Sequence, residues 1–215
     1  IVDGWIVGNF AADFEKIFSN EIMKLNIKCA ISDHEFGIII LYTVKSENYG
    51  IYTMAYEDVL FKSGMRQLAS GVSLVASVDR GGRRYGLIAT SVTSVCVSPP
   101  MLLVCVNKSA SCYDAIKNSG AFCINFLGQS DSDIASQFGS PKYRDLRFGT
   151  GNWMAGKTGA PVLASALASF DCSVRQEMDM VSHSVFIGDV LEIHVKSEIE
   201  MPLIYHNGSY ASINA

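Results

Sequence analysis

The chain has 215 residues, a formal net charge of −4, a hydrophobic fraction of 49% and a charged fraction of 18%. These values exclude a disordered chain and suit one compact domain, or one domain with an extension. The acidic balance and the absence of a long basic run argue against a nucleic-acid partner. No apolar run reaches the roughly 20 residues of a membrane helix, and the N-terminus lacks the order of a secretory signal. We therefore expect a cytoplasmic protein with no membrane association.

Six cysteines are spread along the sequence without a C-x-x-C pair and without a close Cys/His cluster of zinc spacing. Most of them stand among apolar residues, which is typical of small buried side chains in a reducing cytoplasm. No metal site is predicted.

Residues 1–56 form an N-terminal extension without a recognisable chemical motif. The segment ADFEKIFSNEIMKL, residues 12–25, has apolar residues at helical spacing and predicts an amphipathic helix. Gly37 to Val44 predicts a buried strand, and Ser46 to Gly50 predicts a turn. We expect this extension to serve packing or dimer contact.

Residues 57–215 form the second part of the chain. Residues 57–71 predict a helix that ends at Gly71. The strands VSLVASV and RYGLIAT follow, joined by a tight hairpin at Gly81-Gly82, where glycine permits positive φ. A third strand, MLLVCV, begins after Pro99-Pro100.

Further elements alternate with loops. A short helix is predicted with Ser111 as its N-cap and Gly120 at its end, followed by the strand AFCINFL. SDSDIASQF predicts another short helix, capped by Ser130 or Ser132, and residues 139–160 predict a long surface loop. The remainder predicts strands in ALASFDCSVRQEM, SVFIGDVLEIHV, PLIYH and YASI. Many short strands without βαβ alternation predict a mainly β protein, an antiparallel barrel with peripheral helices.

The stretch ATSVTSVCVSPP, residues 89–100, carries an unusual density of hydroxyl side chains. Hydroxyls and turn N–H groups can bind phosphate, but they also cap strand ends and satisfy turn backbone. Taken alone, the stretch favours capping, because such turns are common. No Walker loop and no G-x-G-x-x-G dinucleotide fingerprint is present, so any flavin or nicotinamide site is not of the Rossmann type.

NKSAS, residues 107–111, strengthens the phosphate hypothesis. It places one cation and two hydroxyls at an expected helix N-terminus, which attracts anions. Lys108 by itself is equally typical of a solvated surface residue. The two hydroxyl-rich loops flank one strand, Met101 to Val106, and meet only if neighbouring strands bring them to the same end of the barrel.

Hydrolytic chemistry finds little support, since no G-x-S-x-G elbow is present. His194 alternates within a strand and His34 stands in a polar turn, whereas His183 and His206 lie at strand edges beside small polar residues. A lone histidine is more often structural or solvated than functional.

Six blocks together resemble the short-chain NAD(P)H:flavin reductases, the reductase components of two-component flavin monooxygenases. The blocks are MRQLASGVSLVAS, GLIATSVTSVCVSPPMLLVCVNKSASCYDAI, GAFCINFLGQSDSDIASQF, TGAPVLASALASFDCSV, HSVFIGDV and PLIYHNGSY. The match runs from about residue 57 to residue 212, with the blocks in the family's order. The resemblance implies an FMN-binding split barrel, a six-stranded antiparallel Greek-key barrel, assembled as a homodimer with flavin in a groove near the dimer interface.

The resemblance also implies the site residues. Those of the flavin ring and ribityl chain are Thr90, Ser91, Val92 and Thr93. Those around the phosphate are Asn107, Lys108, Ser109, Ala110, Ser111, Cys112 and Tyr113. His183 matches the histidine of a Gly-Asp-His motif near the nicotinamide and is the candidate catalytic residue. A strand-end segment that also lines the nucleotide site matches Tyr205, His206, Asn207 and Gly208.

Two positions depart from the family pattern. Val181-Ser182-His183 replaces Gly-Asp-His, which leaves open which nicotinamide is used and how tightly it binds. His206 stands where many relatives carry an aromatic residue, so stacking there is altered.

The implied activity is hydride transfer from NADH or NADPH to FMN or FAD, with reduced flavin diffusing to a partner monooxygenase. Transfer from nicotinamide C4 to flavin N5 needs no protein nucleophile, only two rings held at about 3–3.5 Å. His183 is expected to orient the nicotinamide rather than to titrate. Two alternatives stay open: a bound flavin that passes electrons to ferric iron or a cobalt corrinoid, and a flavin-binding protein without reductase activity.

Overall fold

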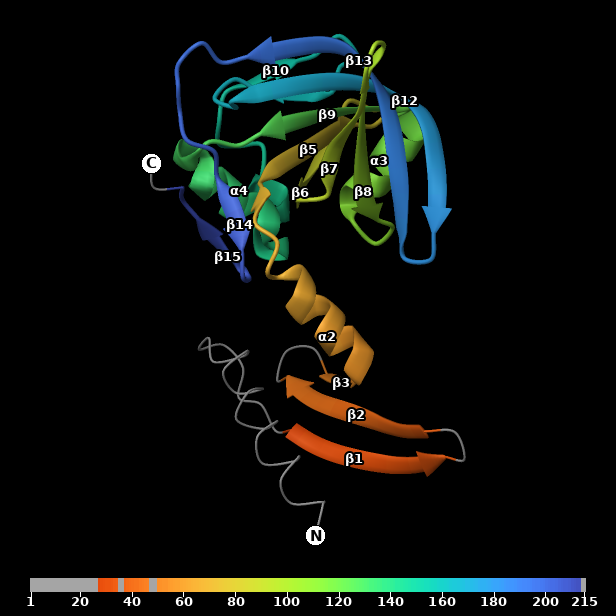
Figure 1. Cartoon of the computed structure of the whole chain (residues 1–215). Helices are drawn as coiled ribbons and strands as arrows, with labels where there is room; N and C mark the ends of the chain where they lie inside the picture. The colour runs from red at the N-terminus through yellow and green to blue at the C-terminus, as the bar shows by residue number, and fades with distance from the viewer. Residues whose placement is uncertain (1–26, 35–36, 47–49, 214–215) are drawn as a thin grey trace. The chain divides into compact units, whose positions relative to one another are not determined.

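The computed structural model describes residues 27–34, 37–46 and 50–213. By internal contacts the chain divides into two units, residues 1–65 and residues 66–215, which are described separately (Figure 1). The amphipathic helix predicted for residues 12–25 lies outside the described residues.

The first unit contains a three-stranded antiparallel sheet in the order β1-β2-β3, followed by helix α2. Its elements are β1 (Ile27–His34), β2 (Gly37–Ser46), β3 (Gly50–Ala55) and α2 (Tyr56–Met65). The strand predicted from Gly37 is confirmed as β2. The other two strands were not predicted, and His34 ends β1 instead of lying in a turn.

The second unit is built on a seven-stranded antiparallel sheet in the order β6-β5-β9-β12-β13-β8-β7. Its strands are β5 (Ser73–Val78), β6 (Arg84–Ala89), β7 (Val92–Val97), β8 (Pro100–Asn107), β9 (Ala121–Phe126), β12 (Ala168–Met180) and β13 (His183–Val195). The outermost strands β6 and β7 are consecutive in the chain, and the Cys105 N–H donates to the Ser91 carbonyl between them (3.2 Å). The sheet therefore curls into a barrel, and the predicted antiparallel split barrel is confirmed.

Smaller elements surround the barrel (Figure 1). They are β4 (Ser70–Gly71), α3 (Ser111–Ser119), η1 (Gln129–Asp131), α4 (Ser132–Gly139), η2 (Pro141–Leu146), β10 (Trp153–Ala155), β11 (Pro161–Leu163), β14 (Ile204–His206) and β15 (Ser209–Ala211). Strand β14 pairs with both β15 and β4, and β10 pairs with β11. Among the described residues, no helix combines the length and apolarity needed to cross a bilayer.

Local sequence signals were correct in some places and wrong in others. The β5–β6 hairpin and the end of α3 at Gly120 are as predicted, and Gly82 and Gly120 have φ of 82° and 69°. The helix expected to end at Gly71 ends at Met65, because Gly71 belongs to strand β4.

The predicted helix caps need correction. The N-cap of α3 is Ala110 rather than Ser111. The N-cap of α4 is Asp131, not Ser130 or Ser132. Asp131 is buried, and its carboxylate accepts hydrogen bonds from the Gly128 N–H (3.1 Å) and the Ser165 hydroxyl (2.7 Å). The loop predicted for residues 139–160 contains η2 and β10.

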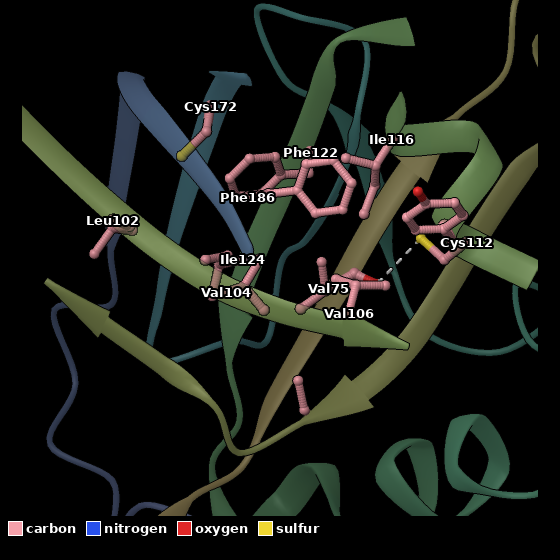
Figure 2. Packing of buried hydrophobic residues seen from close by; sticks show 12 residues of the cluster. Val75, Leu102, Val104, Val106, Cys112, Ile116, Phe122, Ile124, Cys172 and Phe186 are labelled. Atoms are coloured by element: carbon pink, nitrogen blue, oxygen red, sulfur yellow. Dashed lines mark hydrogen bonds between the residues drawn. The ribbon is translucent and has the colours of Figure 1, made fainter. Parts of the chain in front are cut away.

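Apolar side chains fill the interior of the barrel (Figure 2). Phe122, Ile124, Val104 and Phe186 are fully buried there, and α3 adds Ile116. Each such side chain stabilises the fold by about 1.5–3 kcal/mol relative to full exposure. A second cluster, with Phe138 and Leu74 among its members, packs on the other face of β5.

Three cysteines lie in apolar clusters, two of them in the barrel interior. Cys112, Cys123 and Cys172 are buried and free of disulfide bonds. Burial raises the pKa of the Cys112 thiol to about 12 and that of Cys172 to about 12. Cys96 and Cys105 are only partly buried, so the expectation of buried cysteines holds for part of the set.

Candidate functional site

The connection between β6 and β7 borders a cavity of about 340 Å³ with mainly apolar walls. Thr90 and Val92 line it, together with residues of β4 and of the segment before β14. The lining residues are Ser70, Gly71, Val72, Ser73, Thr90, Val92, Phe126, Leu127, Leu167, Pro202 and Leu203. A hydroxyl at the edge of an apolar slot suits a flat, mostly apolar ring with polar rim atoms.

Ser91 has different surroundings. Its hydroxyl donates to the Cys105 carbonyl of β8 at 3.1 Å. This hydroxyl therefore supplies a hydrogen bond to a backbone carbonyl, as the capping interpretation expects. Residues 92–97 form strand β7, with Val92 opposite Val104, so the hydroxyl-rich stretch is a strand as well as a connection. Thr93 is exposed on that strand.

The loop that precedes α3 is held by Asn107. Its Oδ1 accepts hydrogen bonds from the Ser109 N–H and the Ser109 hydroxyl, both at 2.8 Å. The Ala110 N–H donates to the Asn107 carbonyl at 3.0 Å, and α3 begins at Ser111. The loop is thus a compact turn that leads directly to a helix N-terminus.

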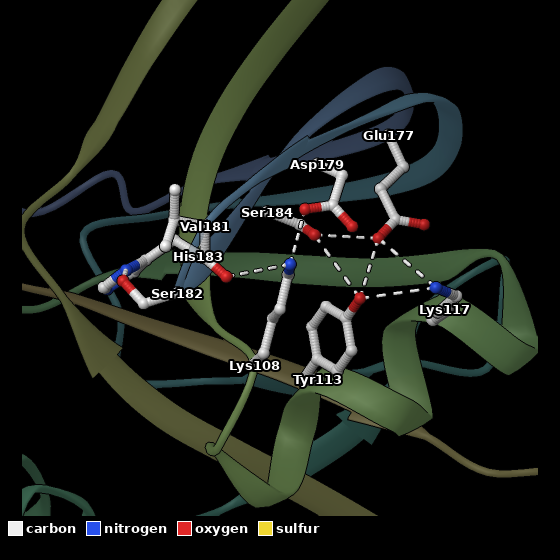
Figure 3. Close-up of polar contacts among 9 residues, drawn as sticks. All are labelled: Lys108, Tyr113, Lys117, Glu177, Asp179, Val181, Ser182, His183 and Ser184. Atoms are coloured by element: carbon white, nitrogen blue, oxygen red, sulfur yellow. Dashed lines mark hydrogen bonds and ion pairs between the residues drawn. The ribbon is translucent and has the colours of Figure 1, made fainter.

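Lys108 binds the turn between β12 and β13 (Figure 3). Its Nζ donates to the Asp179 carboxylate and, at 3.1 Å, to the Val181 carbonyl. Its backbone N–H donates to the Ser182 carbonyl at 3.0 Å. The charge of Lys108 is therefore balanced by Asp179.

His183 is the first residue of β13 and pairs with Asn107 of β8. Its ring Nδ1 lies 2.8 Å from the Ser182 hydroxyl, and the imidazole is exposed. Because a hydrogen bond at one ring nitrogen sets the roles of both, Ser182 constrains the tautomer of His183.

A polar cluster that the sequence did not reveal fastens the β12–β13 hairpin to α3 (Figure 3). The Tyr113 hydroxyl (2.9 Å) and the Ser184 hydroxyl (2.8 Å) donate to Glu177 Oε1, and Lys117 Nζ lies 3.7 Å from the same oxygen. The Ser184 hydrogen bond, followed by that of Tyr113 and the charge of Lys117, holds the pKa of Glu177 below its usual value.

Two members of the predicted phosphate segment, Cys112 and Tyr113, point into the interior. Cys112 is fully buried, and its Sγ lies 3.9 Å from the Val75 carbonyl. Tyr113 packs against Phe186, with ring centroids 5.9 Å apart. Their side chains thus serve α3 packing, and a ligand could meet only their backbone.

The segment from Tyr205 to Gly208 forms the β14–β15 hairpin. Asn207 and Gly208 both have positive φ, 49° and 84°, as a two-residue hairpin turn requires. Tyr205 pairs with Ser70 of β4, which lines the same cavity as Thr90. His206 is exposed at the end of β14.

Strand β8 connects the two halves of the candidate site. Val104 lies opposite Val92 near the cavity, and Asn107 lies opposite His183. Asn107 lies three positions after Val104 along the strand, a distance of about 10 Å. A nucleotide-sized ligand could span both. The structure shows no group of three metal-ligating side chains among the described residues.

Comparison with known proteins identifies the family of the chain. The flavin reductase like domain matches residues 65–214. The chain belongs to this family. FMN reductase (NADH) RutF of Pseudomonas syringae pv. syringae (strain B728a) is 40% identical over 156 residues, which cover 73% of this chain and 86% of that protein.

Solved structures of other proteins show the same fold. Nitrilotriacetate monooxygenase component B from Mycobacterium thermoresistibile is 28% identical, with a TM-score of 0.69 over 74% of this chain and 87% of that chain. BorF, the flavin reductase component of a bacterial two-component tryptophan halogenase, is 27% identical, with a TM-score of 0.67 over 74% of this chain and 99% of that chain. The flavin reductase resemblance is confirmed, and with it the expected enzyme class, a flavin oxidoreductase.

Proposed function

We propose that the protein is an NADH-dependent FMN reductase. The observation that carries this proposal is the cavity beside Thr90, which β8 connects to the exposed ring of His183. The RutF relative is named as an FMN reductase that uses NADH, which favours this pair over FAD and NADPH.

The residues of the chain would bind and orient the two reactants. A bound flavin supplies a ring that accepts a hydride from the nicotinamide. Val92, Phe126 and Leu203 would cover one face of that ring and exclude water, while the Thr90 hydroxyl would hydrogen-bond its polar edge. His183, set by Ser182, would hold the nicotinamide carboxamide, so that most of the rate enhancement comes from positioning.

We infer further that reduced flavin leaves this enzyme for a second protein. The two structural relatives described above are named as parts of a monooxygenase and of a two-component halogenase. Thr90, which lines the cavity, is exposed to solvent. A homodimer and a partner monooxygenase reached by diffusion of the reduced flavin remain part of this proposal.

Steady-state oxidation of nicotinamide tests the activity. The purified protein is mixed with NADH or NADPH and with FMN or FAD, and the loss of nicotinamide absorbance is followed. We expect the highest kcat/KM with NADH and FMN. A protein that binds FMN but oxidises neither nicotinamide would be a flavin-binding protein and would refute the proposal.

Kinetic order then distinguishes a diffusing product from a retained cofactor. Sequential kinetics with weakly held FMN fit a flavin that acts as a substrate. Ping-pong kinetics with FMN retained through gel filtration would contradict the transfer of reduced flavin and would favour another electron acceptor.

A further inference from the structure

The turn that carries His183 lies at the end of a long hairpin that is only partly supported by the sheet. Strand β12 pairs with β9 up to Ser173, and from there to Met180 its strand partner among the described residues is β13. On the other side, His183 pairs with β8. We call residues 176–184, which include the turn and His183, the hairpin end.

Apolar packing contributes little to the position of the turn. Val181 is fully exposed, and Met180 is 49% exposed. Burial of apolar side chains is the main source of stability in a folded chain, and these two side chains bury little surface. The position of the turn therefore depends on polar contacts.

The side-chain contacts that tie the hairpin end to other elements come from residues 108–117 (Figure 3). Lys108 Nζ donates to the Asp179 carboxylate and to the Val181 carbonyl. The Tyr113 hydroxyl donates to Glu177, and Lys117 lies near the same carboxylate. The start of α3 thus holds the hairpin end at two acidic residues.

The two acidic residues differ in their surroundings. The Asp179 side chain is 71% exposed, and an ion pair so exposed contributes little and is screened by salt. The Glu177 side chain is 25% exposed, and its Oε1 accepts hydrogen bonds from the buried Tyr113 (2.9 Å) and Ser184 (2.8 Å) hydroxyls. Hydrogen bonds to a charged acceptor are roughly twice as strong as neutral ones. Glu177 is therefore the stronger of the two contacts.

The contact between Glu177 and Ser184 bears directly on His183. Ser184 follows His183 along β13, and successive side chains of a strand point to opposite faces. Because Ser184 is fully buried on the side of Glu177, the imidazole of His183 faces outwards and is exposed. Figure 3 shows this ring pointing away from Glu177. The buried hydrogen bond thus sets the face on which His183 stands and limits the movement of the turn.

We propose that Glu177 is a positioning residue, which holds the hairpin end so that the ring of His183 meets the nicotinamide of NADH. The proposal rests on the proposed function, which assigns the nicotinamide to His183. Glu177 would touch neither reactant and would act through Ser184 and His183. Lys108 would add a weaker and salt-sensitive contribution through Asp179.

Steady-state kinetics with saturating FMN and varied NADH test the proposal. We expect Glu177→Ala to raise the KM for NADH by about 5-fold or more, because two charge-assisted hydrogen bonds to the hairpin end are lost. The dissociation constant of FMN should stay nearly unchanged. Glu177→Gln keeps an acceptor oxygen without the charge, and it should restore most of the wild-type KM.

A double variant separates positioning from general stabilisation. If Glu177 acts through His183, then Glu177→Ala should have no further effect on the KM in a protein that already carries His183→Ala. A purely structural role would instead add its effect to that of His183→Ala.

Two control variants change β12 contacts away from the hairpin end. Arg175→Ala breaks an exposed ion pair with Asp189. Thr158→Ala removes a hydrogen bond to the buried Asp171 (2.6 Å) and should lower the free energy of unfolding. Both should leave the KM for NADH unchanged. If Glu177→Ala fails to fold, Tyr113→Phe removes one hydrogen bond to Glu177, keeps the ring packed on Phe186, and should raise the KM less strongly.

Nuclear magnetic resonance of the histidine rings gives a measurement without turnover. The ring nitrogen signals of His183 are assigned by their loss in His183→Ala. We expect Glu177→Ala to shift or broaden these signals, since the turn is released, and Glu177→Gln to leave them close to the wild type. The Arg175→Ala and Thr158→Ala controls should not change them.

The proposal is overturned if Glu177→Ala leaves the KM for NADH and the His183 signals unchanged. It is also overturned if the effects of Glu177→Ala and His183→Ala on the KM add fully, or if Glu177→Ala weakens FMN binding as much as it raises the KM. A protein that does not oxidise NADH, but in which Glu177→Ala alters the His183 signals, would refute the proposed function and leave the positioning of His183 by Glu177 supported.

Discussion

Thr90 and Ser91 are adjacent in the sequence, yet their hydroxyl groups meet different surroundings. Thr90 lines the apolar cavity, whereas the Ser91 hydroxyl donates to the Cys105 carbonyl of β8. A flavin in this cavity would meet the Thr90 side chain directly, while Ser91 could offer its backbone without its hydroxyl. The two residues therefore form a matched pair for mutation.

We expect Thr90→Leu to weaken FMN binding by about 10-fold or more, because the larger side chain fills space needed by the ring and removes a hydrogen bond. Ser91→Ala should lower the free energy of unfolding by about 0.5–1.5 kcal/mol and leave FMN affinity nearly unchanged. Fluorescence titration and urea denaturation measure the two effects. If Thr90→Leu binds FMN with unaltered affinity, the flavin ring does not occupy this cavity.

His183 permits a separate prediction about the nicotinamide. Replacement by alanine should raise the KM for NADH several-fold and leave the dissociation constant of FMN nearly unchanged, because the imidazole is expected to orient only the nicotinamide. Ser182→Ala should act in the same direction but less strongly, since it frees the His183 ring without removing it. A larger effect on FMN binding than on KM would contradict this role.

Among the elements, the connection between β13 and β14 supports one wall of the cavity. Pro202 and Leu203 line the cavity, and Glu200 anchors the segment that precedes them. The Glu200 carboxylate pairs with Lys196 Nζ (2.6 Å) and accepts a hydrogen bond from the Ser130 N–H (2.9 Å). These contacts, with that of Lys196 largest, lower the pKa of Glu200 to about 2.

This pKa shift predicts how stability depends on pH. A carboxylate with a depressed folded-state pKa stabilises the fold above its unfolded value, near 4.5, and loses that contribution as the pH falls towards 2. We expect the free energy of unfolding to fall through this range, and Glu200→Gln to make the fall shallower. Urea denaturation at several pH values measures both slopes. Identical slopes in the two proteins would show that Glu200 is not linked to folding.

Local patterns in the sequence predicted correctly those elements that depend on the conformation of a few neighbouring residues. The glycines at Gly82 and Gly120 adopt positive φ, and both the hairpin and the helix end were predicted there. Strand β7 was not predicted as a separate element over its full length, because its adjacent Thr93 and Ser94 resemble a loop, and its pairing with β8 makes it a strand.

The same distinction applies to the candidate site. Family motifs indicated Val92 and His183, and the structure pairs both with residues of β8. The Glu177–Tyr113 contact joins residues 64 positions apart, and no spacing in the sequence reveals it. Likewise, a small cavity is lined by Arg84 of β6 and Arg144 of η2, which only the tertiary fold brings together.

For the whole molecule, the division into two units leads to a prediction about a shortened chain. Residues 66–215 contain both large apolar clusters of the described structure, and the flavin reductase like domain matches residues 65–214. All of the proposed flavin contacts lie in this unit. The unit therefore contains what is needed for a core and for a flavin site.

We expect a chain of residues 66–215 to unfold cooperatively and to bind FMN within a few-fold of the full chain, that is, within about 1 kcal/mol. Thermal denaturation followed by circular dichroism and flavin titration measure these properties. A shortened chain that folds but loses flavin affinity would assign part of the site to the first 65 residues. A shortened chain that does not fold would instead assign them a structural role.

The buried thiols have a consequence for an enzyme that handles reduced flavin, which reacts with dioxygen to give hydrogen peroxide. Peroxide oxidises the thiolate form of cysteine, and it must reach the sulfur to do so. Cys112 and Cys172 are fully buried with pKa values of about 12, so they are almost entirely protonated at neutral pH. The interior of the barrel is thereby protected against an oxidant that the proposed reaction would generate beside it.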